Sequence, residues 1–269
     1  MKEFDFYIVP TPIGNLGDMT FRAVEILKKV DLIACEDSRV TQKLLNHFEI
    51  GTKCVSYHKF NERERVNLII SEIKAGKKVA LVSDAGTPLF CDPGAILVKE
   101  LSKNNFSTTA LAGANALSTF ISALSREGED FYFAGFLPRV QAQAENLLKK
   151  YSDTDFAFYE SPNRILKTLE VLKTCRPNSK VAIGRELTKA FEEIVVDNVE
   201  NVIKYYDENV LKGEIVALVF RDNKEGKQDY DRQIEALMKK GFRAKEIATI
   251  ISELYNANKN EVYKRVLQI

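Results

Sequence analysis

Short apolar runs alternate with amphipathic stretches along the first half of the chain. Several of these runs are apolar throughout, which is typical of strands covered by helices on both faces. The amphipathic stretches between them indicate helical crossovers, so the pattern predicts parallel strands in an α/β domain. The predicted strands are residues 4–9, 31–35, 54–58, 78–83 and 106–111.

Helix boundaries are predicted from capping residues. Asn61 is expected to cap a helix that ends at Gly76, and Asp92 with Pro93 is expected to begin another, since proline is favoured at the first helical position. The first of these helices carries apolar residues at i, i+3, i+4 and i+7, which are Val66, Ile69, Ile70 and Ile73.

A second α/β unit is predicted after the polar stretch 125–130, which interrupts the periodicity. Ser161, followed by Pro162, is expected to cap a helix in this unit. Two strands that flank residues 186–192 indicate that part of the sheet in this unit is antiparallel. The predicted strands are residues 131–136, 155–160, 180–185, 192–196 and 214–220.

The C-terminal part of the chain has a different pattern. Residues 222–228 are polar and aperiodic, as in a linker. Three short helices are predicted after them, in a segment, 228–269, whose net charge is only +2. The sequence leaves open whether this module contacts nucleic acid or is a docked or dimer-stabilising tail. We therefore expect three parts, residues 1–114, 115–222 and 228–269.

Composition narrows the class of protein. The 269 residues are 45% hydrophobic and 29% charged, which indicates a globular protein. The net charge of +1 means that any nucleic-acid contact must come from a local patch. No apolar run approaches the ~20 residues of a membrane span, and the acidic N-terminus does not resemble a secretory signal, so we expect a cytoplasmic protein. Four scattered cysteines and two histidines suggest neither a zinc site nor disulfides, and no metal is expected.

Loops of small and polar residues follow three of the predicted strands, at residues 10–18, 83–88 and 112–116. Ligands bind at the carboxyl ends of strands in open α/β sheets, so these loops predict a pocket. Neither the dinucleotide-binding glycine pattern nor a phosphate-binding P-loop occurs in the sequence. Charged clusters at residues 36–39, 159–164 and 184–190 are consistent either with ion pairs or with a polar substrate site.

Taken together, these segments resemble the tetrapyrrole methylase superfamily of S-adenosylmethionine-dependent enzymes. Within it, the likeness is strongest to enzymes that 2′-O-methylate a cytidine ribose in 16S ribosomal RNA of the small subunit. The motifs that carry the resemblance lie in the family's order at residues 11–16, 36–39, 56–58, 83–88, 135–139, 159–162, 185–189 and 212–214.

The resemblance implies a cofactor, S-adenosylmethionine, in a cleft between two α/β domains, and commonly a homodimer. On the first domain it implies cofactor-binding roles for Pro12, Gly14, Asp84, Gly86, Thr87, Phe90, Asn115 and Ala116. On the second domain it implies the same role for Tyr159, Ser161, Leu187 and Glu214.

Transfer of a methyl group to a ribose hydroxyl needs an acceptor for the hydroxyl proton. The candidates for the catalytic residues are Asp37, Glu186 and Lys189, with an ion-pair network across the cleft as the alternative. Guanidinium groups suit phosphate contacts, and aromatic rings can stack on unpaired bases. The candidate RNA-binding residues are Arg39, Tyr57, His58, Arg164 and Arg185.

Two segments depart from the family pattern. Ala112 and Ala114 replace two prolines in the third loop, and residues 140–145 lack the basic run of many relatives. Three alternatives stay open at this point: methylation of a small tetrapyrrole, an RNA-binding module without catalysis, and an NAD-dependent oxidoreductase. The missing glycine fingerprint disfavours the last.

Overall fold

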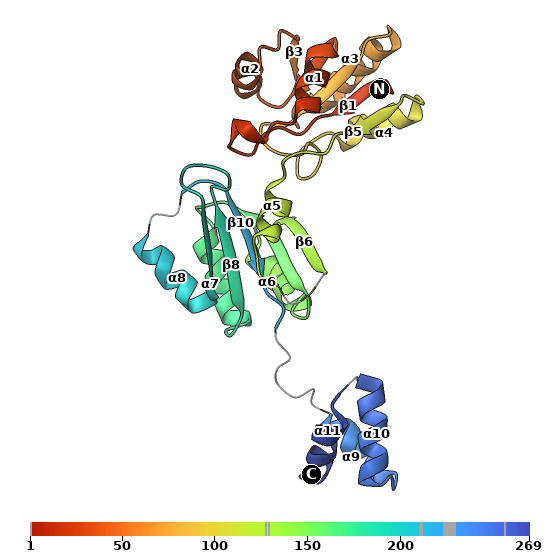
Figure 1. The fold of residues 1–269 in the computed structure, drawn as a ribbon, viewed down its shortest axis with the longest axis vertical. Helices are drawn as coiled ribbons and strands as arrows, with labels where there is room; N and C mark the ends of the chain where they lie inside the picture. Colours follow the sequence, from red (N-terminus) through yellow and green to blue (C-terminus); the bar gives the residue numbers. More distant parts are fainter. Residues whose placement is uncertain (1, 127, 129, 210–211, 223–229, 256) are drawn as a thin grey trace. The chain divides into compact units, whose positions relative to one another are not determined.

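The computed structural model describes residues 2–126, 128, 130–209, 212–222, 230–255 and 257–269 (Figure 1). The chain forms two compact units, Met1–Arg221 and Asp222–Ile269. The first unit contains two five-stranded sheets and the second contains helices. This arrangement confirms the predicted fold class. The boundary expected near residue 114 within the first unit stays a prediction.

The first sheet is entirely parallel, with the strand order β3-β2-β4-β1-β5. All five strands were predicted, and each predicted range extends one or two residues beyond the observed strand at one end or at both, because the flanking residues already turn into loops. The observed strands are β1 (Phe6–Ile8), β2 (Leu32–Cys35), β3 (Cys54–Ser56), β4 (Val79–Val82) and β5 (Thr108–Ala110).

Successive residues of these strands enter two different cores. Tyr7 and Ile33 pack on one face with residues of α1, whereas Phe6 and Leu32 pack on the other with residues of α3 and α4. This double burial explains why β1, β2 and β4 are apolar throughout. The helices around the sheet are η1 (Leu16–Asp18), α1 (Phe21–Lys29), α2 (Ser38–His47), α3 (Glu62–Lys74) and α4 (Ala95–Lys103).

The second sheet is mixed, with the strand order β6-β7-β10-β8-β9. Only β6 and β7 pair in parallel, so the predicted antiparallel component is confirmed. One face is covered by α6, α7 and α8, and the other packs against α5 and Ile13. The elements are α5 (Ala116–Ser122), β6 (Phe131–Phe136), α6 (Gln141–Lys150), β7 (Asp155–Glu160), α7 (Ile165–Cys175), β8 (Lys180–Arg185), β9 (Glu193–Asn198), α8 (Val199–Glu208) and β10 (Ile215–Val219).

Two predicted helix starts are wrong, and at a third helix the start is right but the predicted capping bond is absent. Helix α4 begins at Ala95, because Gly94, with φ of 133°, still turns the chain after Asp92 and Pro93. Helix α7 begins at Ile165, after a turn in which the Ser161 carbonyl accepts hydrogen bonds from Arg164 and Ile165. Helix α3 does begin after Asn61, but the Asn61 side chain makes no capping hydrogen bond and bonds backward instead.

The second unit has its own apolar core, which includes Ile234, Ile247, Ile251 and Val262. It contains α9 (Asp231–Lys239), α10 (Ala244–Tyr255) and α11 (Lys259–Val266), which confirms the three predicted helices. Most of the predicted linker, residues 223–228, lies outside the described residues. In the part of the chain that the structure describes, every helix is too short or too polar to cross a membrane.

Candidate functional site

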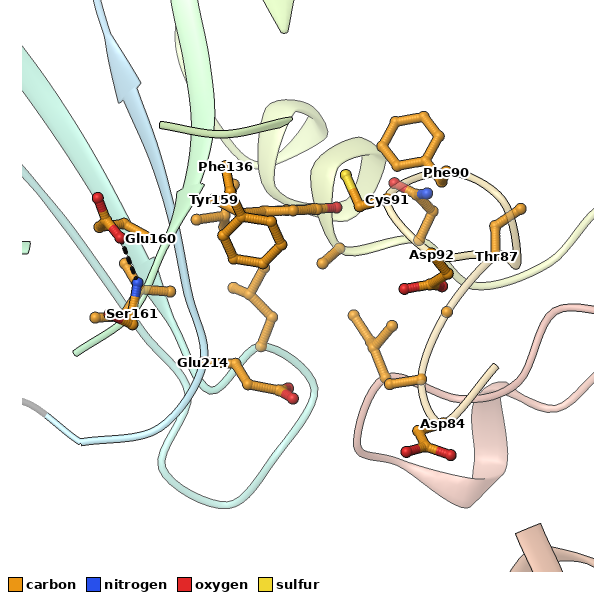
Figure 2. A pocket seen from close by; sticks show the side chains of 18 of the residues that line it. Asp84, Thr87, Phe90, Cys91, Asp92, Phe136, Tyr159, Glu160, Ser161 and Glu214 are labelled. Carbon is orange, nitrogen blue, oxygen red and sulfur yellow. Dashed lines mark hydrogen bonds between the residues drawn. The ribbon is translucent and has the colours of Figure 1, made fainter. Parts of the chain in front are cut away.

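A cavity of about 410 Å³ lies where loops from the two sheets of the first unit meet (Figure 2). Its volume falls within the range of roughly 300 to 1,000 Å³ that is typical of small-molecule sites. The first half of the chain contributes Ile13, Glu36, Asp84, Ala85, Gly86, Thr87, Phe90, Cys91, Asp92, Asn115 and Ala116. The second half contributes Phe136, Tyr159, Glu160, Ser161, Pro162, Leu187, Gly213, Glu214, Ile215 and Val216.

Hydrogen bonds hold the loops after β1 and β4 together. The backbones of Thr11 and Gly86 bond to each other in both directions, at 2.9 Å. The Thr11 hydroxyl also donates to the Ser83 carbonyl, at 3.0 Å. Gly86 has φ of 77°, a conformation that favours glycine, and a Cβ there would lie 3.3 Å from the side chain of Ile13. This glycine lets the two loops approach closely at the cavity wall.

The start of α5 forms another part of the wall. The Asn115 side chain accepts hydrogen bonds from the backbone N–H groups of Leu117 and Ser118, at 3.0 and 3.2 Å, and so caps the helix. The Tyr159 hydroxyl, from β7, also accepts from Leu117, at 3.2 Å. The Thr87 hydroxyl donates to the Ala114 carbonyl, at 3.1 Å. These bonds join the first sheet, α5 and the second sheet around one cavity.

The end of β7 supplies a buried carboxylate. Glu160 is 2% exposed and accepts hydrogen bonds from the Ser161 backbone and the Thr168 hydroxyl (Figure 2). Arg164 pairs with it at 3.1 Å and also donates to the carbonyls of Leu137 and Pro138. Glu160 therefore orients the turn that follows β7, and Arg164 is engaged within the fold.

Acidic side chains dominate the charge of the cavity. Among the described residues that line it, Glu36, Asp84, Asp92, Glu160 and Glu214 are carboxylates and none is Lys, Arg or His. Burial raises the pKa values of Glu36, Asp84 and Asp92, and repulsion from neighbouring carboxylates raises them further. Figure 2 shows Asp84 and Asp92 on the side opposite Glu214. The cavity thus suits a ligand that carries positive charge.

Aromatic side chains form the rest of the wall. The rings of Phe136 and Tyr159 lie 5.6 Å apart, and Phe90 belongs to the opposite loop (Figure 2). Burial raises the pKa of Tyr159 to about 12, so its hydroxyl stays neutral at physiological pH. Such rings suit a flat apolar group such as a purine.

Lys189 extends from the loop between β8 and β9 to the loop after β1. Its ammonium bonds Glu186 at 2.9 Å and Glu214 at 3.1 Å. Burial alone would lower the pKa of Lys189, but these bonds outweigh it and raise the pKa, while the bond from Lys189 lowers the pKa of Glu186. A Cβ on Gly14 would overlap the Lys189 side chain. The lysine is therefore a fixed cation and a poor proton acceptor.

Asp37 and Arg39 lie at the start of α2. The Asp37 carboxylate caps the helix and pairs with the Arg39 guanidinium at 2.6 Å. Hydrogen bonds from Arg39 lower the pKa of Asp37 to about 2. Asp37 does not line the cavity, although its backbone N–H donates to Asp84 at 3.0 Å. This carboxylate is a weak base, and the Arg39 side chain, 88% exposed, is open to a ligand.

Most of the residues expected to bind a cofactor lie together in the cavity wall. Pro12 and Gly14 do not line it, and the residue between them, Ile13, does. The predicted residues that line the cavity are Asp84, Gly86, Thr87, Phe90, Asn115, Ala116, Tyr159, Ser161, Leu187 and Glu214.

The residues expected to bind RNA are more scattered. Tyr57 is 1% exposed and its hydroxyl donates to Glu62 at 2.7 Å, so its ring belongs to the core and offers no face to a base. Arg185 bonds Glu193 and the Lys212 carbonyl. Arg39 and the half-buried His58 are the candidates whose side chains reach solvent on the first sheet.

Sequence reasoning assigned no binding role to several residues of the cavity wall, among them Glu36, Asp92, Phe136 and Glu160, although Glu36 and Glu160 lie in charged clusters that it marked as a possible substrate site. The feature that could have identified most of these residues in the sequence is their position at the end of a strand. Glu36 follows β2, Phe136 ends β6 and Glu160 ends β7, where side chains can face a crevice at the sheet edge. Asp92 was assigned to a helix start, and this assignment hid its place in the cavity.

The chain matches the model of the family of tetrapyrrole (corrin/porphyrin) methylases over residues 5–203. It is 39% identical to the ribosomal RNA small subunit methyltransferase I of Bacillus subtilis (strain 168), over 96% of this chain and 92% of that relative. It is 40% identical to the protein of the same name from Vibrio cholerae serotype O1, with the same coverage of each chain.

Solved structures share the fold at much lower identity. A cobalt precorrin-4 methyltransferase aligns with a TM-score of 0.62 and 16% identity, over 80% of this chain and 94% of that one. A diphthine synthase aligns with a TM-score of 0.64 and 15% identity, over 80% of this chain and 89% of that one.

Proposed function

We propose that this chain, which belongs to the family of tetrapyrrole (corrin/porphyrin) methylases, transfers a methyl group from S-adenosylmethionine to ribosomal RNA of the small subunit. We further propose that the acceptor is the 2′-hydroxyl of a cytidine ribose in 16S ribosomal RNA. The names of relatives about 40% identical over nearly the whole chain support the RNA substrate.

The acid-lined cavity is the observation that carries this proposal. S-adenosylmethionine has a sulfonium and an ammonium group and one carboxylate, so its net charge is positive, and it also has an adenine ring and a ribose. Carboxylates of Asp84, Asp92 and Glu214 match the cationic groups, and the rings of Phe136 and Tyr159 match the adenine. A cavity without cationic side chains in its described lining does not suit a phosphate-rich ligand, so the RNA phosphates must stay outside it.

The main catalytic contribution of the chain is positioning. The cofactor supplies a methyl group that is already electrophilic. The protein must hold the ribose hydroxyl in line with it and exclude water, an effect worth up to ~7 to 11 kcal/mol. A nearby group that accepts the hydroxyl proton adds ~10² to 10⁴-fold. The raised pKa values of Glu36 and Asp92 make these carboxylates stronger bases than Asp37.

The three residues that the sequence suggested as catalytic, Asp37, Glu186 and Lys189, then have supporting roles. Lys189 and Glu186 position Glu214 at the cavity wall, because the lysine bonds both carboxylates. Asp37 holds Arg39 at the start of α2, three residues after the cavity residue Glu36, and the exposed guanidinium suits an RNA phosphate. These assignments make Lys189 a positioning residue and not a proton acceptor.

A labelled-methyl assay tests the proposal. The protein is incubated with methyl-labelled S-adenosylmethionine and small ribosomal subunits from a strain that lacks this gene. We expect label in 16S RNA within alkali-resistant dinucleotides, because a 2′-O-methyl group blocks alkaline cleavage. Label on a base, or transfer to a porphyrin and not to RNA, contradicts the proposal.

The variant Asp84→Asn tests the role of cavity charge. The amide keeps an acceptor for the Asp37 backbone N–H but removes the negative charge. We expect calorimetry to show roughly tenfold weaker cofactor binding, the loss of ~1.4 kcal/mol. Asp18→Asn is the matched control, because Asp18 is exposed and outside the cavity lining. Equal affinities of both variants and the wild type would remove Asp84 from the cofactor site.

A further inference from the structure

Phe60 presents its ring to solvent at the turn between β3 and α3. It is 95% exposed, the largest value among the large hydrophobic side chains described. The ring is absent from both cores of the first sheet. Its only described ring contact is with His58, edge to face, with centroids 6.0 Å apart. The fold itself therefore gains little from an aromatic side chain at this position.

The turn that carries Phe60 is held by several hydrogen bonds. The Asn61 side chain accepts from the His58 backbone at 2.8 Å and donates to the Ser56 carbonyl at 3.2 Å. The Asn61 backbone N–H donates to the His58 carbonyl at 3.0 Å, and the Phe60 N–H donates to His58 Nδ1 at 3.3 Å. The backbone that carries the ring is thus held in place, which lowers the entropy lost when a ligand binds there.

Cationic residues flank Phe60 in the sequence, with the exposed Glu64 as one acidic neighbour. Lys59 and Arg63 are exposed and have no ion-pair partner among the described residues. The nearby Glu62 is half-buried, and its carboxylate accepts from the Tyr57 hydroxyl and the Gly94 N–H. A flat apolar ring beside unpaired cations is complementary to a nucleotide, which has a planar base and an anionic phosphate.

The turn is also attached to the cavity wall. Glu62 bonds Gly94, two residues after the cavity residue Asp92. Tyr57 and Asp92 share the lining of a smaller hollow, together with Glu36, which also lines the main cavity. Arg39 follows β2, the strand next to β3, so it lies at the same edge of the sheet. This places the ring on the part of the first domain that borders the cavity.

We infer that Phe60, supported by His58, is a stacking platform for an unpaired base of the RNA substrate, and that Lys59 and Arg63 contact its phosphates. The inference rests on the proposed function, because it names the surface on which that RNA is held. The stacked base is a neighbour of the modified nucleotide, whose own ribose must enter the cavity. Phe60 is therefore a substrate-positioning residue.

The variants Phe60→Ala, Phe60→Leu and Phe60→Trp test the platform with the full-length protein. We expect Phe60→Ala and Phe60→Leu to bind a single-stranded RNA oligonucleotide roughly 5- to 140-fold more weakly at fixed salt, the range expected for loss of one stacked base. Phe60→Trp retains a ring and is expected to preserve binding. The KM for small subunits should rise in parallel, with the KM for S-adenosylmethionine unchanged.

Phe21→Ala is the matched control. Phe21 is 92% exposed and lies at the start of α1. This helix follows β1, which is three positions away from β3 in the strand order of the first sheet. We expect wild-type RNA binding from this variant. We also expect Lys59→Ala to reduce the slope of log affinity against log salt by about 1, as for loss of one phosphate contact.

Three outcomes overturn the inference. Wild-type RNA affinity of Phe60→Ala shows that no base stacks there. Equal losses in Phe60→Ala and Phe21→Ala show a general effect of exposed apolar surface. A change of oligomeric state in Phe60→Ala, seen by sedimentation, assigns the surface to a second copy of the chain. Failure of the wild type to methylate RNA defeats the proposed function instead, and the oligonucleotide measurement still decides the platform.

Discussion

At the scale of single residues, the negative charge of Asp92 lowers the stability of the fold but favours the binding of a cationic ligand. Burial raises the pKa of its carboxyl group, a bond with Ser83 opposes this, and repulsion from Asp84 adds to it. A raised pKa means that the folded chain binds this proton more tightly than the unfolded chain does, so the ionised carboxylate destabilises the fold at neutral pH. The same negative charge is what the cavity offers to a cationic ligand.

Replacing Asp92 with Asn should therefore stabilise the unliganded protein and weaken cofactor binding. We expect a higher Tm than that of the wild type at pH 7, because the raised pKa makes the native carboxylate less stable than the unfolded one. The difference in Tm between the variant and the wild type should shrink toward pH 4. Below the unfolded pKa of ~3.9, the carboxyl group of the wild type is neutral in both the folded and the unfolded chain. Thermal unfolding across this pH range checks the first part, and calorimetry with S-adenosylmethionine checks the second. A lower Tm at pH 7 would contradict the assignment.

At the scale of elements, the period of hydrophobic residues predicted the strands well and the capping residues predicted helix starts poorly. Strands β1, β2, β4 and β10 are buried throughout, and their own apolar residues reveal this. The start of α4 depends on Gly94, which has φ of 133° and where a Cβ would lie only 2.8 Å from the Leu89 side chain and 3.3 Å from that of Leu81. Asn61 turns toward Ser56 because β3 ends beside it. Such long-range partners are invisible in a local pattern.

Helix α5 depends on its cap more than the longer helices do, because it has only seven residues. Replacing Asn115 with Ala removes the acceptor for the N–H groups of Leu117 and Ser118. We expect a loss of ~0.5 to 2 kcal/mol in the free energy of unfolding. Asn115→Asp should keep most of the stability, because aspartate is an equally good capping residue. Urea denaturation of the variants measures both effects, and an unchanged midpoint in Asn115→Ala would show that the Tyr159 hydroxyl alone suffices.

At the scale of the whole molecule, the sequence predicted both α/β sheets, the helical C-terminal module and most of the cavity wall. The wall was predictable because small and polar residues gather at strand ends. The burial of Tyr57 was not, since its partner Glu62 belongs to a helix that packs against another loop. The predicted homodimer and the roles of the site residues stay predictions.

The two compact units should be separable. Each has an apolar core made of its own residues. A chain that ends at Asp222 is therefore expected to unfold cooperatively and to bind S-adenosylmethionine with the affinity of the full-length protein, within about twofold, since among the described residues the cavity lining ends at Val216. Calorimetry on both chains measures this. Loss of binding in a folded short chain would show that the C-terminal helices support the cavity.

The contact between Lys189 and Gly14 has a consequence for how this protein can evolve. The lysine stem occupies the space that any larger residue at position 14 would need. The two positions share one volume, so a side chain gained at the first must be matched by a shorter one at the second. Divergence at positions 14 and 189 therefore requires paired substitutions. A lineage that acquires only one of them passes through an intermediate in which the Glu186 and Glu214 carboxylates lose the Lys189 ammonium as their common counter-ion.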